Sequence, residues 1–192
     1  MGIGFDGLGT DEALRTLDLI NTGDGSLDMV MQLKSRRSGE IIGESERDFG
    51  DNKPRLDIMG YYLGAANPTD QSTGQAMGRR QYSAMRVLRA SDAATASIMS
   101  MFATNDDGIT VEVSVFKAGG DARAKDTQPV LRIKLEMVRV KTFTLLAGPA
   151  AQGQMEIIEF AFRKIQVESA PQQNIGKRGA VRSFSDDLGG QA

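Results

Sequence analysis

Residues 110–168 hold three long runs in which apolar and polar side chains alternate, and this stretch constrains the fold more than any other. In the first run, Val111, Val113 and Val115 alternate with Glu112 and Ser114. Successive side chains of a strand point to opposite faces, so the pattern predicts a strand with one apolar and one polar face. Three such runs joined by short, turn-rich connections predict a mainly β protein.

The second and third runs each change parity part-way along. Such a change needs a bulge or bend, where two residues face one on the partner strand, and we expect the first of them near Met137. Two bent strands in one sheet predict a curled sheet or barrel. The apolar positions before and after each change are Leu131, Ile133 and Leu135, then Val138 and Val140; and Ile158, Phe160 and Phe162, then Ile165 and Val167.

The composition excludes several kinds of chemistry. The 192 residues suit one globular domain with extensions, and they include no cysteine and no histidine. Disulfides, thiol catalysis, Cys/His zinc sites and histidine acid–base chemistry are therefore excluded. The formal net charge of −2 gives no reason to expect nucleic acid as a partner.

No motif for catalysis or cofactor binding stands in a suitable context. The glycines of residues 2–7 have a loosely suggestive spacing but no strand before them, so dinucleotide binding is not predicted. Asp106 and Asp107 form the one pair with a faint resemblance to a metal site, and a helix-ending turn is the ordinary interpretation of such a pair. We expect no enzymatic activity, no cofactor and no metal, although a carboxylate-dependent hydrolase remains a third, weaker hypothesis.

The chain divides into three parts. Residues 1–26 form a glycine-rich N-terminal extension, residues 27–170 a β domain that opens with a strand at 28–34, and residues 171–192 a tail with a short edge strand at 181–185. No apolar run approaches the roughly 20 residues of a membrane span. The first residues lack the features of a signal peptide, so we expect the protein to start in the cytoplasm.

A polar segment at 35–55 follows the first strand. A structureless loop of this length is uncommon in a compact domain, and is usually functional or disordered. The segment is either a mobile surface loop or an arm that reaches a partner subunit. Its candidate assembly residues are Arg36, Arg37, Glu40, Glu44, Glu46, Arg47 and Asp48.

The middle of the chain predicts a strand at 56–64, a flexible turn at 67–78 and a strand at 81–90. Arginines gather in and before this last strand. Phosphate binding is one interpretation, but acidic residues elsewhere balance the charge, so we favour a solvated or interface strand. The four arginines are Arg79, Arg80, Arg86 and Arg89.

One helix is predicted at 93–103, capped by Ser91 or Asp92. Its apolar residues recur at the spacing of a single helix face. We expect this face to pack against the sheet rather than to form a binding groove. Its members are Ala94, Ile98, Met101 and Phe102.

In the order and spacing of these elements, the sequence from residue 28 to residue 188 resembles the Hcp tube proteins of the bacterial type VI secretion system. The parity shift after Met137 is similar to one in that family. Four strings carry the rest of the resemblance, namely Met29-Val30-Met31, Ile58-Met59-Gly60-Tyr61-Tyr62-Leu63-Gly64, Val115-Phe116-Lys117-Ala118-Gly119-Gly120 and the run from Phe160 to Glu168. Residues 1–26 have no counterpart in the family's usual form.

The resemblance implies a two-sheet β-barrel with one flanking helix, assembled as a hexameric ring. Rings of this family stack into a tube that is expelled by a contracting sheath and carries small effectors in its lumen. It implies sheath, spike and effector proteins as partners, and secretion without a cleavable signal peptide. Polar neighbours of the predicted core positions are then candidates to line the lumen or contact another subunit: Glu112, Arg132, Lys134, Glu136, Glu159 and Gln166.

Two other functions remain open. One is a tail-tube protein of a related phage-like contractile particle. The other is a non-catalytic β-barrel binding or adaptor module that is a monomer or dimer. The mass of the protein in solution distinguishes a ring from either small form.

Overall fold

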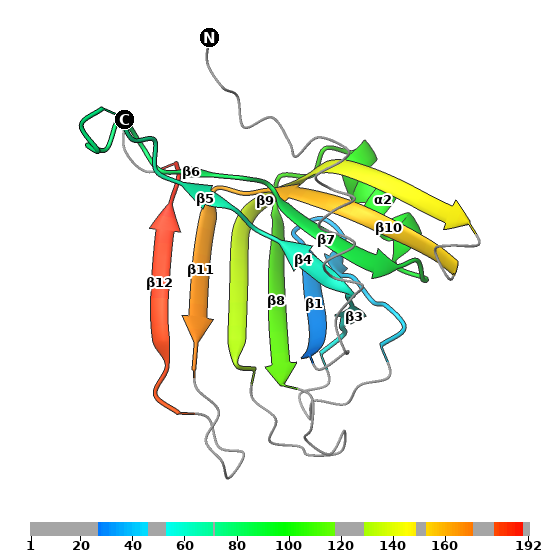
Figure 1. Cartoon of the computed structure of the whole chain (residues 1–192). Coiled ribbons are helices and arrows are strands. Elements are labelled where there is room, and N and C mark those ends of the chain that lie inside the picture. Colours follow the sequence, from blue (N-terminus) through cyan, green and yellow to red (C-terminus); the bar gives the residue numbers. More distant parts are fainter. Residues whose placement is uncertain are drawn as a thin grey trace.

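The computed structural model describes residues 27–45, 53–70, 72–117, 129–148, 153–170 and 179–189. The predicted N-terminal extension lies outside these residues. Within them, one helix accompanies twelve strands (Figure 1). Their bounds are β1 Leu27–Ser35, β2 Gly39–Glu40, β3 Leu56–Asp57, β4 Gly60–Tyr62, β5 Ala65–Ala66, β6 Gln81–Tyr82, β7 Met85–Ala90, α2 Thr95–Ala103, β8 Ile109–Lys117, β9 Leu131–Gly148, β10 Gly153–Ala161, β11 Lys164–Ser169 and β12 Arg182–Asp187.

Ten of the twelve strands form two antiparallel sheets that share β9, and β5 and β6 form a separate two-stranded sheet. The first sheet has the order β2, β1, β8, β9, β11, β12, and the second has the order β9, β10, β7, β4. Figure 1 shows β9 bending from the first sheet into the second. A single 18-residue strand therefore belongs to both layers.

The bend in β9 lies where the sequence predicted it. Val111 pairs with Leu135, but Ile109 pairs with Val138, so β9 has one more residue than β8 between these pairs. Met137 there adopts a φ of 51°, which non-glycine residues rarely take. The predicted bulge is confirmed. The parity change in the third run has another cause, because the chain leaves one sheet after Ala161 and enters the other at Lys164.

The two sheets are also joined on their far side. The short segment 56–62 pairs through β3 with β1 and through β4 with β7. Its Ile58 N–H donates to Met29, whereas its Met59 N–H donates to Leu88. The two-sheet fold is confirmed, but the continuous path of paired strands runs from β2 to β4 and remains open, so the predicted barrel is not a closed ladder.

The core lies between the sheets and under α2. Of the thirteen apolar positions named in the three predicted runs, ten are buried: Val111, Val113, Val115, Ile133, Leu135, Val138, Val140, Ile158, Phe160 and Ile165. The other three, Leu131, Phe162 and Val167, are partly buried against this cluster. Alternation along the strands thus identified the apolar face correctly.

The helix differs from its prediction in two respects. It begins at Thr95, because Asp92 forms a turn in front of it, where the Asp92 carboxylate accepts the Ala94 N–H. Ile98 and Met101 are buried, but 45% of Phe102 is exposed, so its predicted core position is wrong. Phe102 lies at the edge of the helix stripe, where the turn of the helix carries it out of the interface.

Two other predicted segments are more ordered than expected. The polar segment 35–55 begins with a hairpin, because Lys34 and Ser35 of β1 pair with Glu40 and Gly39 of β2. The predicted flexible turn at 67–78 is the outer part of a second hairpin, built on β5 and β6 and extended by the bridge between Thr69 and Ala76. This hairpin, residues 65–82, projects past β12 (Figure 1).

Candidate functional site

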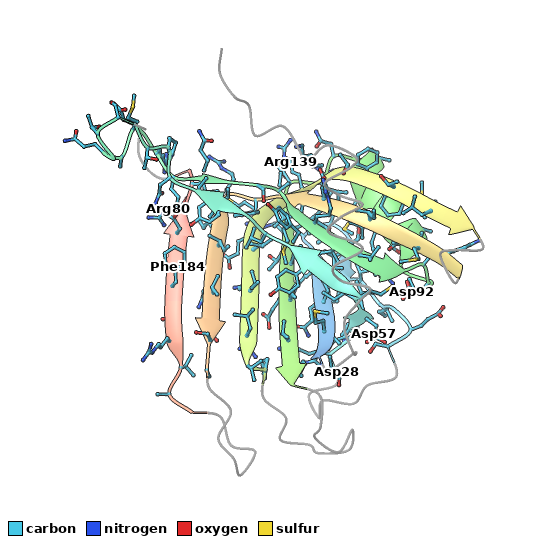
Figure 2. All side chains as sticks on the ribbon, viewed as in Figure 1. Asp28, Asp57, Arg80, Asp92, Arg139 and Phe184 are labelled. Carbon is cyan, nitrogen blue, oxygen red and sulfur yellow. The ribbon has the colours of Figure 1, made fainter. Side chains whose placement is uncertain are left out.

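The outer face of the first sheet carries the largest set of residues that the sequence singled out. Glu112 on β8 pairs with Lys134 on β9, which pairs with Gln166 on β11. The row extends to Gln32 on β1 and Ser185 on β12. Side chains directly opposite in antiparallel strands lie on the same face, so five strands present one continuous polar row. Figure 2 shows the side chains along these strands.

Arg132 ties the next row to the first. It pairs with Ser114 on one side and with Glu168 on the other. Its guanidinium lies 3.0 Å from a Glu112 carboxylate oxygen and 3.5 Å from one of Glu168. Their side chains are 34%, 26% and 23% exposed for Arg132, Glu112 and Glu168, so this network faces solvent but is packed along the sheet. We call the two rows, with the hollow described next, the polar face.

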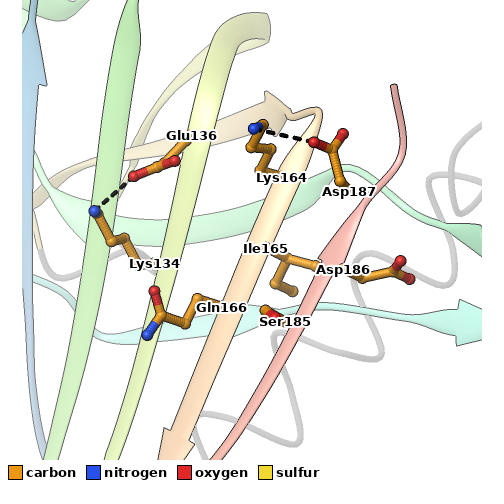
Figure 3. A pocket seen from close by; sticks show the side chains of 8 residues that line it. All are labelled: Lys134, Glu136, Lys164, Ile165, Gln166, Ser185, Asp186 and Asp187. Atoms are coloured by element: carbon orange, nitrogen blue, oxygen red, sulfur yellow. Dashed lines mark ion pairs between the residues drawn. The ribbon is translucent and has the colours of Figure 1, made fainter. Parts of the chain in front are cut away.

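A shallow hollow of about 270 Å³ continues the polar face toward β12 (Figure 3). Lys134 Nζ lies 2.6 Å from Glu136, and Lys164 Nζ lies 3.0 Å from Asp187. Each ammonium group thus faces a carboxylate. The described residues contain no group of His, Cys, Asp or Glu side chains arranged to hold a metal ion.

The polar face mixes both signs of charge and pairs them internally. Arg132, Lys134 and Lys164 lie among the carboxylates of Glu112, Glu136, Glu168 and Asp187. Such a surface has no strong field of one sign to retain a charged molecule. Exposed ion pairs of this kind contribute little to stability, typically ~0.2–1 kcal/mol each, so the face can tolerate substitution.

Five of the six residues predicted to line a lumen or contact a subunit meet on this face. Glu159 is the sixth, and it lies on β10 in the second sheet. It is 9% exposed and accepts hydrogen bonds from the Arg86 guanidinium, the Nε bond being 2.9 Å long. Glu159 therefore lies apart from the polar face.

The predicted arm residues are distributed differently. Arg36, Arg37 and Glu40 are exposed in or beside the β1–β2 hairpin. Glu44 lies against the turn that precedes α2. The remaining three, Glu46, Arg47 and Asp48, fall outside the described residues.

A clasp of four residues fastens the projecting hairpin to the edge of the first sheet. Tyr82 and Arg80 both donate to Asp186 Oδ2, over 2.9 and 3.0 Å. The Arg80 guanidinium lies 5.6 Å from the centre of the Phe184 ring, within the range of a cation–π contact. The clasp thus consists of Arg80, Tyr82, Phe184 and Asp186, and it holds β12 next to the hairpin.

A buried ionic cluster was not predicted. Arg89 is 1% exposed, and its guanidinium lies 2.8 Å from Glu156 and 2.5 Å from Asp92. Thr95 Oγ1 donates to the other oxygen of Glu156, over 2.8 Å. The interpretation of 81–90 as one solvated or interface strand is therefore wrong for Arg86 and Arg89. Arg89 shares its parity with the buried Met85 and Val87, and this was the signal that could have revealed it.

The two carboxylates of this cluster are shifted in opposite directions. Burial raises the pKa of Glu156, and its hydrogen bonds from Thr95 and Arg89 only partly offset this effect. Burial also acts to raise the pKa of Asp92, but hydrogen bonds from Arg89 and from the Ala94 N–H outweigh it, so this pKa lies below its usual value. Asp92 is accordingly the firmly ionised partner of Arg89.

The helix-ending turn is a structural feature, as expected of the Asp106–Asp107 pair. Asp106 is buried, and its carboxylate accepts the Ser35 hydroxyl and the Gly108 N–H. Burial opposes ionisation, but these two bonds hold the pKa of Asp106 below its usual value. Asp107 pairs with Arg139 at the surface.

No helix in the described part of the chain is long and apolar enough to cross a membrane.

No curated protein matches the sequence significantly. Among solved structures, one described as "Structure of a type six secretion system protein" is 23% identical with a TM-score of 0.69, covering 84% of this chain and 96% of that chain. A "Crystal structure of Hcp protein" is 16% identical with a TM-score of 0.67, covering 84% and 98%. The Hcp1 protein from E. coli EAEC 042 pathovar is 17% identical with a TM-score of 0.64, covering 84% and 98%.

These likenesses establish a shared fold. A family model described as "Type VI secretion system effector, Hcp" matches residues 31–168, which is 138 of the 192 residues. The match begins within β1, includes all the strands from β2 to β10 and β11 up to Glu168, and ends before β12. The chain therefore belongs to the Hcp family, the tube proteins of the type VI secretion system.

Proposed function

We propose that this tube subunit assembles as a hexameric ring, that rings stack into the tube, and that the polar face lines the central channel. The single observation that supports this most strongly is the polar row across five strands, directly behind a closely packed core. A channel wall needs a broad face that water and cargo can touch without unfolding the subunit. The six-fold symmetry is taken from the family resemblance.

The edge of the first sheet favours a head-to-tail contact between subunits. β12 pairs with β11 on one side and with no other described strand. Natural proteins protect an edge of this kind from open-ended pairing. A ring does so because a head-to-tail contact closes when the rotation between subunits divides the circle.

The mixed charge of the polar face suits transport rather than retention. Effectors of different charge could pass such a wall, because no field of one sign would hold them. In this function the protein has no active site. The protein is cytoplasmic before the tube is expelled, and it is then secreted without a cleavable signal peptide. Sheath and spike proteins are its partners in this process. The exposed arm residues Arg36, Arg37 and Glu40 are candidates for contacts between subunits or rings, together with Glu46, Arg47 and Asp48.

Negative-stain images of the purified full chain test the ring directly. Hollow rings are expected, and a monomer at all concentrations and salt conditions would contradict the proposal and favour the small binding module. The channel is tested with Arg132→Glu and Lys134→Glu together, which should leave the fold intact and change ring assembly or effector retention. A matched control is Arg139→Glu with Lys141→Glu, which makes the same change of charge on exposed positions of the same strand. If the control alters retention equally, the polar face is not the channel wall.

A further inference from the structure

The five residues 41–45, called the linker below, follow β2 within the polar segment 35–55 and lie on the body of the subunit. Ile41 is 5% exposed, and its N–H donates to Leu33 over 2.8 Å. At the other end of this linker, the Ser45 hydroxyl donates to Asp57 over 2.9 Å. The linker is therefore held against the body of the subunit at both ends.

Gly43 allows the middle of the linker to approach the body closely. A Cβ atom at this position would overlap Leu56 Cδ2 and would lie 2.9 Å from Asp92 Oδ2. Any side chain at this position would therefore require Leu56, Asp92 or the linker itself to move. The glycine is needed for this close approach, since its backbone shows no positive φ.

Glu44 and the start of the helix exchange two hydrogen bonds. The Glu44 N–H donates to Asp92 Oδ2 over 3.2 Å, and the Ala93 N–H donates to Glu44 Oε1 over 3.2 Å. The second bond places a carboxylate at the N-terminal end of α2, where exposed N–H groups favour negative charge. Both bonds depend on the position of the Asp92 side chain or of the turn it forms.

Asp92 is in turn oriented from inside the protein. Its Oδ1 accepts the Ala94 N–H over 2.8 Å and lies 2.5 Å from Arg89 Nη2, which leaves Oδ2 directed at Glu44. Arg89 is held by Glu156, which is fully buried on β10. One chain of contacts thus runs from the centre of the second sheet to the surface linker.

We propose that Arg89, Asp92 and Glu156 form a positioning cluster that fixes the linker 41–45 on the body of the subunit. This inference rests on the proposed function only where the linker is given a role in assembly. Buried ion pairs are weak as a source of stability, because apolar residues of similar volume often replace them without loss. Their directional bonds can instead specify one geometry. Here the two carboxylate oxygens of Asp92 have different donors, since Oδ1 contacts Ala94 and Arg89 and Oδ2 contacts Glu44.

Amide hydrogen exchange at residue 44 tests the cluster in the full-length protein, because this N–H is the donor to Asp92. Asp92→Asn preserves the shape but removes the charge that holds Arg89, and it should speed exchange at residue 44 at least tenfold. Asp107→Asn is the matched control, since Asp107 lies in the turn beyond the other end of the same helix and pairs at the surface. It should leave residue 44 unchanged. Unchanged exchange in Asp92→Asn would overturn the proposal.

A second variant separates positioning from stability. Arg89→Met with Glu156→Met replaces the buried pair by apolar side chains and leaves Asp92 in place. It should unfold cooperatively, but its N–H at residue 44 should lose protection from hydrogen exchange. Retained protection would show that Asp92 keeps its position without Arg89 and Glu156. If this double variant does not fold, Glu156→Gln provides the same comparison. Faster exchange is expected at residue 44. Unchanged exchange would contradict the idea that Glu156 on β10 orients Asp92 through Arg89.

Electron microscopy of the same variants keeps the two proposals distinguishable. Lost protection at residue 44 with normal rings and tubes supports the positioning cluster and contradicts an assembly role for the linker. Retained protection in Asp92→Asn contradicts the positioning cluster, whatever the state of the tubes.

Discussion

Removing Arg89 alone should destabilise the protein in a pH-dependent manner. Arg89→Met leaves Glu156 fully buried without its cation. The carboxyl group is then expected to take up a proton, because burial favours its neutral form. Protonating a carboxyl group of ordinary pKa 4.5 at pH 7 costs about 3.4 kcal/mol, at ~1.36 kcal/mol per pH unit. This figure agrees with the ~3–5 kcal/mol measured when one partner of a buried pair is removed.

The pH dependence follows from the direction of the pKa change. A carboxyl group whose pKa is higher in the folded than in the unfolded state favours folding below the unfolded pKa, and this contribution is lost as the pH rises through the folded pKa. In Arg89→Met the pKa of Glu156 rises further than in the natural protein. The destabilisation caused by Glu156 should therefore be greatest at pH 7 and fade toward pH 4.5.

Urea unfolding at both pH values measures the effect, at fixed protein concentration because ring assembly would add a concentration-dependent term. Arg89→Met with Glu156→Met is the control and should be more stable than Arg89→Met alone, since no buried carboxyl group remains. A loss below about 1 kcal/mol, or a loss that is equal at both pH values, would refute the reasoning.

Three further predictions concern packing and the clasp. Ile98→Ala should lower the free energy of unfolding by about 2–5 kcal/mol and Phe102→Ala by roughly 1–2, because Phe102 is half-exposed, and equal losses in urea unfolding would contradict this burial. Gly43→Ala should lower the free energy of unfolding by about 1–3 kcal/mol. Gly148→Ala places its Cβ in open space and should change the free energy of unfolding by less than about 0.5 kcal/mol. Thermal unfolding of both variants checks the difference. Tyr82→Phe removes a bond of the clasp and should speed hydrogen exchange in the hairpin 65–82, while unchanged exchange would show that β12 does not hold this hairpin.

Features that depend on neighbours in sequence were predictable. The alternation around Val113 identified the core face, and the parity change identified the bulge at Met137, because both arise from the two-residue period of a strand. The same parity gathered Lys134 and its neighbours on the polar face. The expected ring assembly came only from the sequence strings that resemble the Hcp family, because no local pattern of apolar and polar residues predicts it.

Features that depend on distant partners were not predictable. Arg89 looked solvent-exposed because arginine is seldom fully buried, yet Glu156 and Asp92, contributed by another strand and by a turn, compensate its charge. Phe102 has the correct helical spacing, but the width of the buried stripe is set by the sheet beneath. The sequence makes Glu44 a candidate residue of an assembly arm, because its bonds to the turn before α2 exist only in the folded chain.

The pairing of β1 with β8 has a consequence for synthesis of the protein. Leu33 pairs with Val111, which is 78 residues further along the chain. At a translation rate of roughly 5–20 residues per second, β1 waits about 4–16 s before the ribosome has made its partner. During this interval Met31 and Leu33, both buried in the folded subunit, have no sheet to cover them. A chaperone that binds short apolar segments is therefore expected to contact the nascent chain at β1 and to dissociate once β8 has emerged.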